Sequence, residues 1–217
     1  MDEDVAMMDV DGQETPTSTS NSQWVAPPAS PQDLSSVWTA ENSTQQRIIQ
    51  FITRWPPSRT PFAYGPWIYA SRGGMSEGIA GQDIPGLKAA FQALLGAGRV
   101  TVDTVDQISK TNNVVTGKWM IFEESPKIDM LWGKILHFVT VERKKGVVKV
   151  STCKEGEKHV ICIYVNDYTN KPEVDALRKG LRSLGVKWRI GFKTDAYTHL
   201  NIYKDNPWNL RPSRFQE

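Results

Sequence analysis

The stretch T-G-K-W-M-I-F at 116–122, followed by I-D-M-L-W at 128–132, decides the fold. The first run is typical of a strand, whose period of two places Trp119 and Ile121 on one face and Lys118 on the other. The second begins a helix over 128–139, where apolar residues recur at spacings of three and four. We therefore expect Trp119 and Trp132 in one core, and Lys118 on the open face of a sheet.

Similar patterns predict strands and helices on both sides of this stretch. The expected strands cover 67–70, 118–122, 147–151, 160–165, 188–192 and 197–203, and the expected helices cover 42–54, 84–96, 101–109, 128–139 and 172–184. A hairpin turn is expected at R-K-K-G, 143–146, and a charged turn at 154–158. Strands joined by tight turns pair antiparallel, and the helices then cover one face. The fold class is therefore α+β: a curved antiparallel sheet backed on one face by about three helices.

Strand alternation also predicts which side chains lie on the open face. Rings and cations together suit stacking on bases and pairing with phosphate. The same rings could instead be covered by residues 55–75 or by the C-terminal segment, and alternation leaves that alternative open. The candidate RNA- or phosphate-binding residues are Lys118, Lys149, Lys154, Lys158, Tyr164, Lys193, Tyr197 and His199.

The C-terminal run N-P-W-N-L-R-P-S-R-F, 206–215, is a second candidate surface. Tryptophan and arginine are enriched at the energetic centres of protein interfaces, so Trp208, Arg211 and Arg214 are candidate partner-binding residues. The competing interpretation is that Trp208 packs back on the sheet and latches the C-terminus.

The charge distribution favours an anionic partner. Residues 1–40 contain seven acidic residues and no Lys or Arg, which leaves 26 basic against 17 acidic residues over 41–217, an excess of nine. A basic body suits RNA or a nucleotide, although positive charge also simply maintains solubility.

The composition bounds the class of protein. The chain has 217 residues, of which 39% are hydrophobic and 23% charged, and no apolar run approaches the length of a membrane span. Two cysteines provide no disulfide framework, and the acidic N-terminus is not a secretory signal, so we expect a cytoplasmic or nuclear monomer. Residues 1–32 are polar and proline-rich and are expected to be disordered, with one α+β domain over 33–217.

No pattern of catalytic residues is evident, and we expect neither an enzyme nor a cofactor. Asp195 and His199 would lie about 13 Å apart along a strand, and Cys162 and His159 would point to opposite faces. Three histidines without ligand spacing provide no metal site.

The order of these elements resembles that of the eukaryotic mRNA cap-binding translation initiation factor. T-G-K-W-M-I resembles that family's strand, I-D-M-L-W-G-K-I-L its following helix, and F-K-T-D-A-Y-T its closing region. The resemblance implies a curved sheet with a ligand on the concave face. The chain lacks the family's tryptophan–glutamate pair before Thr116, where D-Q-I-S-K-T-N-N-V-V stands, and has Tyr164 at a ligand-side tryptophan position. These departures argue against recognition of the cap itself.

A closer resemblance is to the eukaryotic Bles family of basophilic leukaemia-expressed proteins, whose biochemical role is not established. It rests on T-G-K-W-M-I-F and on the run at 193–213, which includes N-P-W-N-L-R-P. The resemblance implies the same fold as the cap-binding factor. The function expected is a non-catalytic module that binds RNA or a nucleotide through the concave face. The alternative is a protein-interaction adaptor that uses the helical back or the Asn-Pro-Trp segment.

Overall fold

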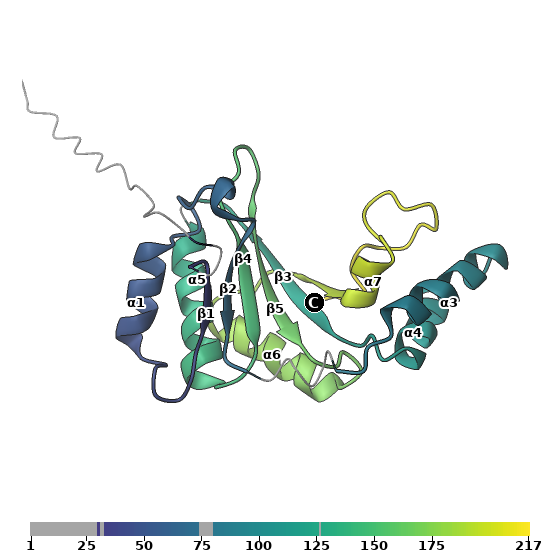
Figure 1. Ribbon diagram of the computed structural model, residues 1–217, viewed down its shortest axis with the longest axis horizontal. Helices are drawn as coiled ribbons and strands as arrows, with labels where there is room; N and C mark the ends of the chain where they lie inside the picture. Colours follow the sequence, from purple (N-terminus) through teal and green to yellow (C-terminus); the bar gives the residue numbers. More distant parts are fainter. Residues whose placement is uncertain (1–29, 31–32, 74–79, 126) are drawn as a thin grey trace, which may run out of the picture.

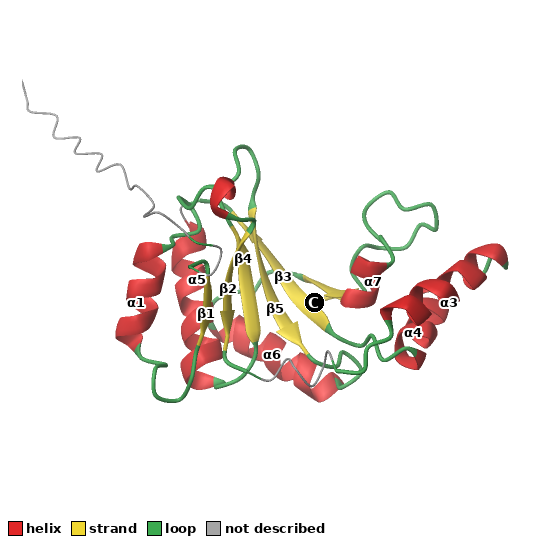
Figure 2. Cartoon of the chain, in the orientation of Figure 1, coloured by secondary structure: helices red, strands yellow, loops and turns green. Residues whose placement is uncertain are grey.

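A computed structural model describes residues 30, 33–73, 80–125 and 127–217 (Figures 1 and 2). The expected disordered tail over 1–32 lies almost wholly outside these residues. The helices are α1 Gln45–Arg54, α3 Ile84–Gly96, α4 Val102–Thr111, α5 Lys127–His137, α6 Lys171–Ser183 and α7 Asp195–His199, with a 3₁₀ turn η1 Phe62–Tyr64 and a π-helical turn η2 Phe138–Glu142. The strands are β1 Ser35–Val37, β2 Trp67–Ser71, β3 Gly117–Glu123, β4 Val147–Ser151, β5 His159–Val165, β6 Gly191–Thr194 and β7 Phe215–Gln216.

The strands form one seven-stranded sheet in the order β1-β2-β4-β5-β3-β6-β7. Every pairing is antiparallel except that of β1 with β2, which is parallel. The α+β class is therefore confirmed, although the sheet is mixed rather than purely antiparallel. The two-residue strand β7 was not expected; it brings the C-terminal segment onto the sheet beside β6.

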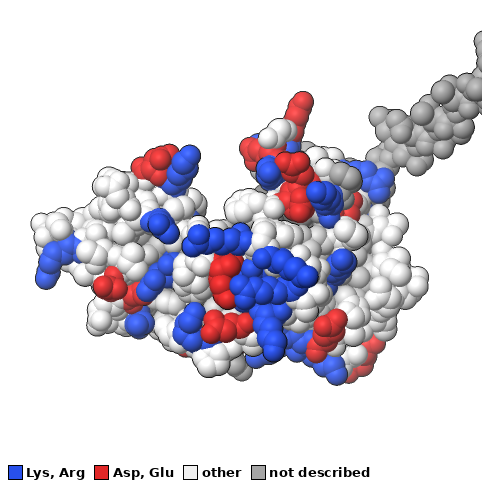
Figure 3. All heavy atoms as spheres, turned by 180° about the vertical axis from the view of Figure 1, so that it is seen from behind, with Lys and Arg blue, Asp and Glu red and all other residues white. Residues whose placement is uncertain are grey.

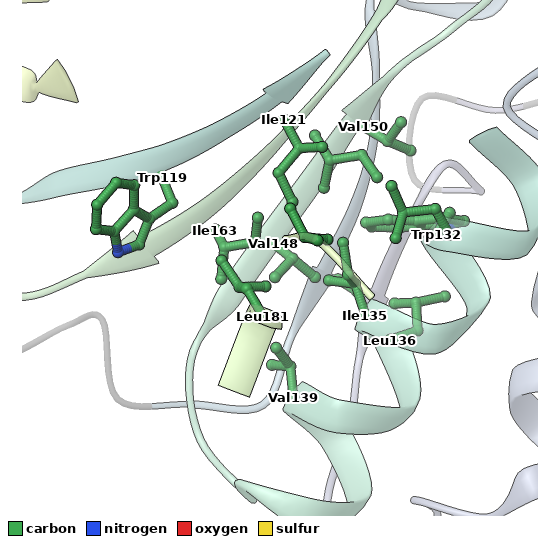
Figure 4. Packing of buried hydrophobic residues seen from close by; sticks show 14 of the residues in the cluster. Trp119, Ile121, Trp132, Ile135, Leu136, Val139, Val148, Val150, Ile163 and Leu181 are labelled. Atoms are coloured by element: carbon green, nitrogen blue, oxygen red, sulfur yellow. The ribbon is translucent and has the colours of Figure 1, made fainter. Parts of the chain in front are cut away.

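Helices α1, α5 and α6 cover one face of the sheet, in agreement with the expected three (Figure 1). Every second residue along the middle of the central strands β3, β4 and β5 points into this core. These residues are fully buried: Trp119, Ile121, Val148, Val150, Ile161 and Ile163. Trp132, Ile135 and Leu136 of α5 pack against them (Figure 4). Trp119 and Trp132 thus belong to one core, as the alternation predicts, and truncating either to alanine would cost about 3–5 kcal/mol.

The ring of Trp119 also joins the core to the far edge of the sheet. Its centroid lies 5.3 Å from that of Phe192 on β6 and 5.5 Å from that of Phe215 on β7, with an edge-to-face geometry in both pairs. The indole Nε1 donates to the carbonyl of Val174 on α6 at 3.4 Å. Trp119 therefore stabilises the attachment of the short strand β7.

Helices α3, α4 and α7 form a second cluster, apart from α1 and α5 at the other side of the molecule (Figure 1). Its core contains Leu87 and Phe91 of α3, Val105 of α4, and Ala196 and Tyr197 of α7. Asp83 caps α3 by accepting from the amide of Gly86 at 2.8 Å, and Thr101 caps α4. This division into two clusters was not predicted.

Three local predictions were wrong. Residues 197–203 do not form a strand, because Thr194 accepts a hydrogen bond from the amide of Tyr197 and caps the helix α7 instead. The strand expected at 188–192 begins three residues later, at Gly191. The turn at 143–146 joins η2 to β4 and is not a hairpin between two strands. None of the helices in the described part of the chain is both long and apolar enough to cross a bilayer.

Candidate ligand-binding groove

A groove of about 690 Å³ crosses the face of the sheet opposite the helices. Strands β2 to β6 supply its base, and residues 188–190 and 203–213 contribute to its sides. Of the described residues that line it, five are cationic and none is Asp or Glu: Lys118, Lys149, Arg189, Lys193 and Lys204. Four aromatic side chains line it as well: Trp67, Phe122, Trp188 and Tyr203. The groove is therefore both cationic and rich in rings.

The strand register explains why three lysines gather here. Lys118 on β3 lies opposite Lys193 on β6, and on its other side it lies opposite Tyr164 on β5. Lys149 on β4 lies opposite Cys162 on β5. Since directly paired residues share a face, these side chains all point away from the helical layer. The predicted face of Lys118, Lys149 and Tyr164 is confirmed.

Lys118 is the most constrained of the three lysines. Its Nζ lies 2.5 Å from Oδ1 of Asp195 on α7 and 3.3 Å from the hydroxyl of Thr198. The hydroxyl of Thr116 donates to the other carboxylate oxygen at 2.6 Å. This network fixes α7 against β3 at the end of the groove, so part of the charge of Lys118 is already neutralised.

Lys149 lies against aromatic rings. Its Nζ is 3.9 Å from the ring centroid of Trp67 and 5.7 Å from that of Tyr164. Burial lowers the pKa of the Lys149 amine, and the positive charge of Lys118 acts in the same direction. Burial likewise raises the pKa of the Tyr164 phenol, so the ring stays neutral at physiological pH.

Lys193 lies deepest, with only 5% of its surface exposed. Its Nζ donates to the carbonyl of Ile202 at 3.0 Å and lies 3.5 Å from the ring centroid of Tyr203. Burial, assisted by the charge of Lys118, lowers the pKa of this amine to about 8. About a tenth of Lys193 is therefore uncharged at pH 7, far more than of an ordinary lysine.

Two of the residues predicted for this face lie elsewhere. Tyr197 is 1% exposed and belongs to the core of the second cluster, because it sits on the helix α7 and not on a strand. His199 lies at the end of the same helix, and burial lowers the pKa of its imidazole against the opposing effect of Asp195. Asp195 and His199 are one helical turn apart, which corrects the distance of about 13 Å expected from a strand.

The other two predicted lysines lie on the exposed turn between β4 and β5. Lys154 pairs with Glu157, and Lys158 pairs with Glu124 at 2.9 Å. Neither residue lines the groove. The phosphate-binding set predicted from the sequence therefore divides into a groove group and a solvent-exposed group.

The C-terminal segment is held by the second cluster. Trp208 is half-buried, and its ring centroid lies 5.0 Å from that of Phe91 on α3. Arg214 donates to both carboxylate oxygens of Asp106 on α4, and only Arg211 of the three candidate partner residues is exposed. The packing interpretation of Trp208 is thus supported, but its partner is α3 and not the sheet.

His159 is engaged outside the groove. Its Nδ1 lies 3.0 Å from the carbonyl oxygen of Ser151 and its Nε2 lies 2.9 Å from the hydroxyl of Ser125. Cys162 lines the groove, and burial raises the pKa of its thiol to about 11, so it remains protonated at neutral pH. Across the described ranges, no three His, Cys, Asp or Glu side chains come together as a metal site.

Residues 86–201 match the model of the family described as basophilic leukemia-expressed protein Bles03. This match covers more than half of the chain. The chain belongs to the Bles03 family.

The Bles03 match includes the three groove lysines and the strands β3 to β6 that carry them. It ends before residues 203–213, which form one side of the groove. The resemblance to the cap-binding translation initiation factor is not tested by the Bles03 match and stays a prediction.

Sequence reasoning missed several lining residues of this Bles03 protein. Phe122 shares the strand parity of Lys118, and Trp67 faces the same side as Lys149 across one strand pair, so alternation could have found both. Trp188 and Arg189 were expected at the start of a strand over 188–192 but precede β6 in a non-repetitive segment, and Lys204 follows α7, so strand alternation does not assign their faces. Their position depends on tertiary contacts, such as the hydrogen bond from Arg178 of α6 to the carbonyl of Trp188.

Proposed function

We propose that this Bles03 protein is a non-catalytic module that binds single-stranded RNA or a nucleotide in the groove. The observation that carries the proposal is the lining itself: five cations and four aromatic rings, with no carboxylate among the described lining residues. Grooves that bind single strands combine cations along the phosphate backbone with rings on which bases stack. A duplex would instead require a broad surface for its two backbones.

Three rings of the groove are substantially exposed to solvent. Phe122 is 56% exposed, Tyr203 is 50% exposed and Trp188 is 44% exposed. Stacking of one base on a ring contributes about 1–3 kcal/mol in proteins that bind single strands. Trp67 and Tyr203 each have a lysine ammonium over the ring, Lys149 at 3.9 Å and Lys193 at 3.5 Å from the centroid. Phe122 and Trp188 are therefore the better platforms.

Two of the groove cations, Lys149 and Lys193, are held by contacts weaker than those that phosphate would provide. Lys149 and Lys193 lie over rings, and a cation–π contact contributes about 0.5–2 kcal/mol. A charge-assisted hydrogen bond to phosphate is stronger than a neutral one, so we expect a bound phosphate to draw Lys149 away from the Trp67 ring. Recognition of the methylated cap is not part of the proposal, because the tryptophan–glutamate pair is absent from the sequence before Thr116.

The adaptor alternative has less support. Trp208 and Arg214, which would be its anchors, are in contact with Phe91 and Asp106.

The view from behind shows Lys and Arg side chains gathered near the middle of that face, with some Asp and Glu among them (Figure 3). Such a face can attract RNA non-specifically, so affinity alone does not locate the binding site.

The test is fluorescence anisotropy with labelled RNA oligonucleotides of about ten bases, at about 50 mM salt, where counterion release favours binding most. Lys149→Met is expected to weaken binding several-fold and to reduce the slope of log affinity against log salt. The matched control is Lys179→Met, an exposed lysine on α6, which should change both quantities much less. Absence of binding below about 100 μM, or equal losses in the two variants, would count against the groove.

A further inference from the structure

Lys193 differs from the other two lysines of the groove in what surrounds its amine. Lys118 has the carboxylate of Asp195, and Lys149 lies on the ring of Trp67 in a less buried position. Within the described ranges, no carboxylate oxygen lies within ion-pair distance of Lys193 Nζ. Its partners are the neutral carbonyl of Ile202 and the ring of Tyr203.

The charged groups around Lys193 disfavour its ammonium form. Lys118 on β3 is its direct cross-strand neighbour, and Lys149 on β4 and Lys204 line the same groove. The nearby carboxylate of Asp195 on α7 is engaged by Lys118 and Thr116. A lysine that is desolvated beside another cation is the arrangement by which proteins obtain a nucleophilic amine near neutral pH.

The groove also limits which electrophiles can reach this amine. Its cations favour an anionic molecule, and its rings favour a planar, apolar body.

Other possible nucleophiles near Lys193 are less reactive. The thiol of Cys162 and the phenol of Tyr164 are both protonated at neutral pH, because burial raises the pKa of each group. Burial also lowers the pKa of the Lys149 amine, but the Lys193 amine, with a pKa of about 8, loses its proton more readily. Lys193 is therefore the groove's best nucleophile toward a carbonyl carbon.

We propose that Lys193 forms a reversible Schiff base with anionic aromatic aldehydes that enter the groove. The neutral amine attacks the carbonyl carbon, and proton transfer from nitrogen to oxygen gives a carbinolamine. Loss of the hydroxyl group as water forms the C=N bond, so one amine and one aldehyde give one imine and one water without any oxidant or reductant. The inference rests on the proposed use of the groove as a ligand site, but not on RNA being the ligand.

The probe is pyridoxal 5′-phosphate, an aromatic aldehyde that carries a phosphate. The protein is incubated with a small excess of the probe at about pH 7.5, the imine is reduced with borohydride, and the modified lysines are identified by peptide mass spectrometry. With a pKa of about 8, roughly a quarter of the Lys193 amine is neutral at this pH, against about a thousandth for an ordinary lysine. Because a weaker base is also a weaker nucleophile, we expect at least about tenfold faster labelling of Lys193 than of the exposed Lys204.

Labelling of Lys193 no faster than that of Lys204 overturns the proposal, and this comparison needs no variant. Lys193→Arg then removes the nucleophile and keeps the positive charge, so rapid labelling should disappear while Lys204 is labelled as before. The RNA measurement separates the two proposals. If Lys193 is labelled rapidly but the protein does not bind RNA, only the proposed function is contradicted. If the protein binds RNA but Lys193 is labelled slowly, only the Schiff-base proposal is contradicted.

Discussion

Arg214 donates two hydrogen bonds to Oδ2 of Asp106, one from Nε at 2.9 Å and one from Nη2 at 2.8 Å. The pair joins the segment that precedes β7 to helix α4 of the second cluster. The phenol of Tyr168 donates to the same carboxylate at 3.1 Å. Since Pro212 and Ser213 line the groove, this contact also positions one of its sides.

The first prediction concerns this ion pair. Asp106→Asn should lower the free energy of unfolding by about 2 kcal/mol, because Arg214 loses a charged, largely buried partner. The control is Glu217→Gln, which breaks the exposed pair of Glu217 with Arg182 and should cost less than about 1 kcal/mol. Urea denaturation measures both free energies, and equal costs would show that the Arg214–Asp106 contact contributes no more to stability than an exposed ion pair.

A second prediction compares two helical glycines. A Cβ added at Gly180 on α6 would lie 2.2 Å from Cζ of Phe138, whereas one added at Gly96 at the end of α3 meets no atom within 4 Å. Alanine is better than glycine in a helix by about 1 kcal/mol. Gly96→Ala should therefore leave the melting temperature unchanged or raise it, and Gly180→Ala should lower it. Equal changes in the melting temperature of the two variants would mean that the Phe138 ring moves aside without cost.

The third prediction concerns the exposed rings. Trp188→Ala should weaken RNA binding by about 1–3 kcal/mol if one base stacks on the indole. It should leave the unfolding midpoint almost unchanged, because the side chain is exposed. Phe62→Ala is the control, since Phe62 is an exposed ring outside the groove lining. An unaltered affinity in Trp188→Ala would remove this ring from the binding site.

The strands and helices with clear periodicity were predictable from the sequence. Trp119, Ile121 and the apolar positions of β4 and β5 alternate, so both their strands and their buried face could be assigned. Helix α7 has only five residues, too few for a period of 3.6 to stand out against the alternation of Leu200 and Ile202. The signal that identifies it is the Thr194-Asp195 pair, a helix cap followed by an acid in the first turn.

The candidate site was only partly predictable, for a related reason. Strand parity placed Lys118, Lys149 and Tyr164 correctly, because their strands are regular. It says nothing about Trp188, whose carbonyl accepts from Arg178 of α6, or about Lys204, which follows α7. Alternation also could not show that Asp195 neutralises Lys118, since the two residues are distant in the chain and meet only through the β3–α7 contact.

The last prediction concerns the pH dependence of RNA binding. Binding of phosphate favours the ammonium form of Lys193, and this amine is already charged below its pKa of about 8. RNA affinity should therefore be full below about pH 7 and fall by up to about tenfold between pH 7 and 9 as the proton is lost. Lys149, whose pKa is also lowered, adds to the fall in the same direction.

Lys193→Arg provides the matched control, because a guanidinium keeps its charge throughout this range. The RNA affinity of the variant should fall less between pH 7 and 9 than that of the native protein. At pH 7 the affinities of the two proteins should agree within a few-fold. Anisotropy titrations at constant ionic strength measure both curves, and RNA phosphodiesters do not titrate in this range. Parallel curves would show that Lys193 does not contact phosphate, and would leave that role to the other groove cations, Lys118, Lys149, Arg189 and Lys204.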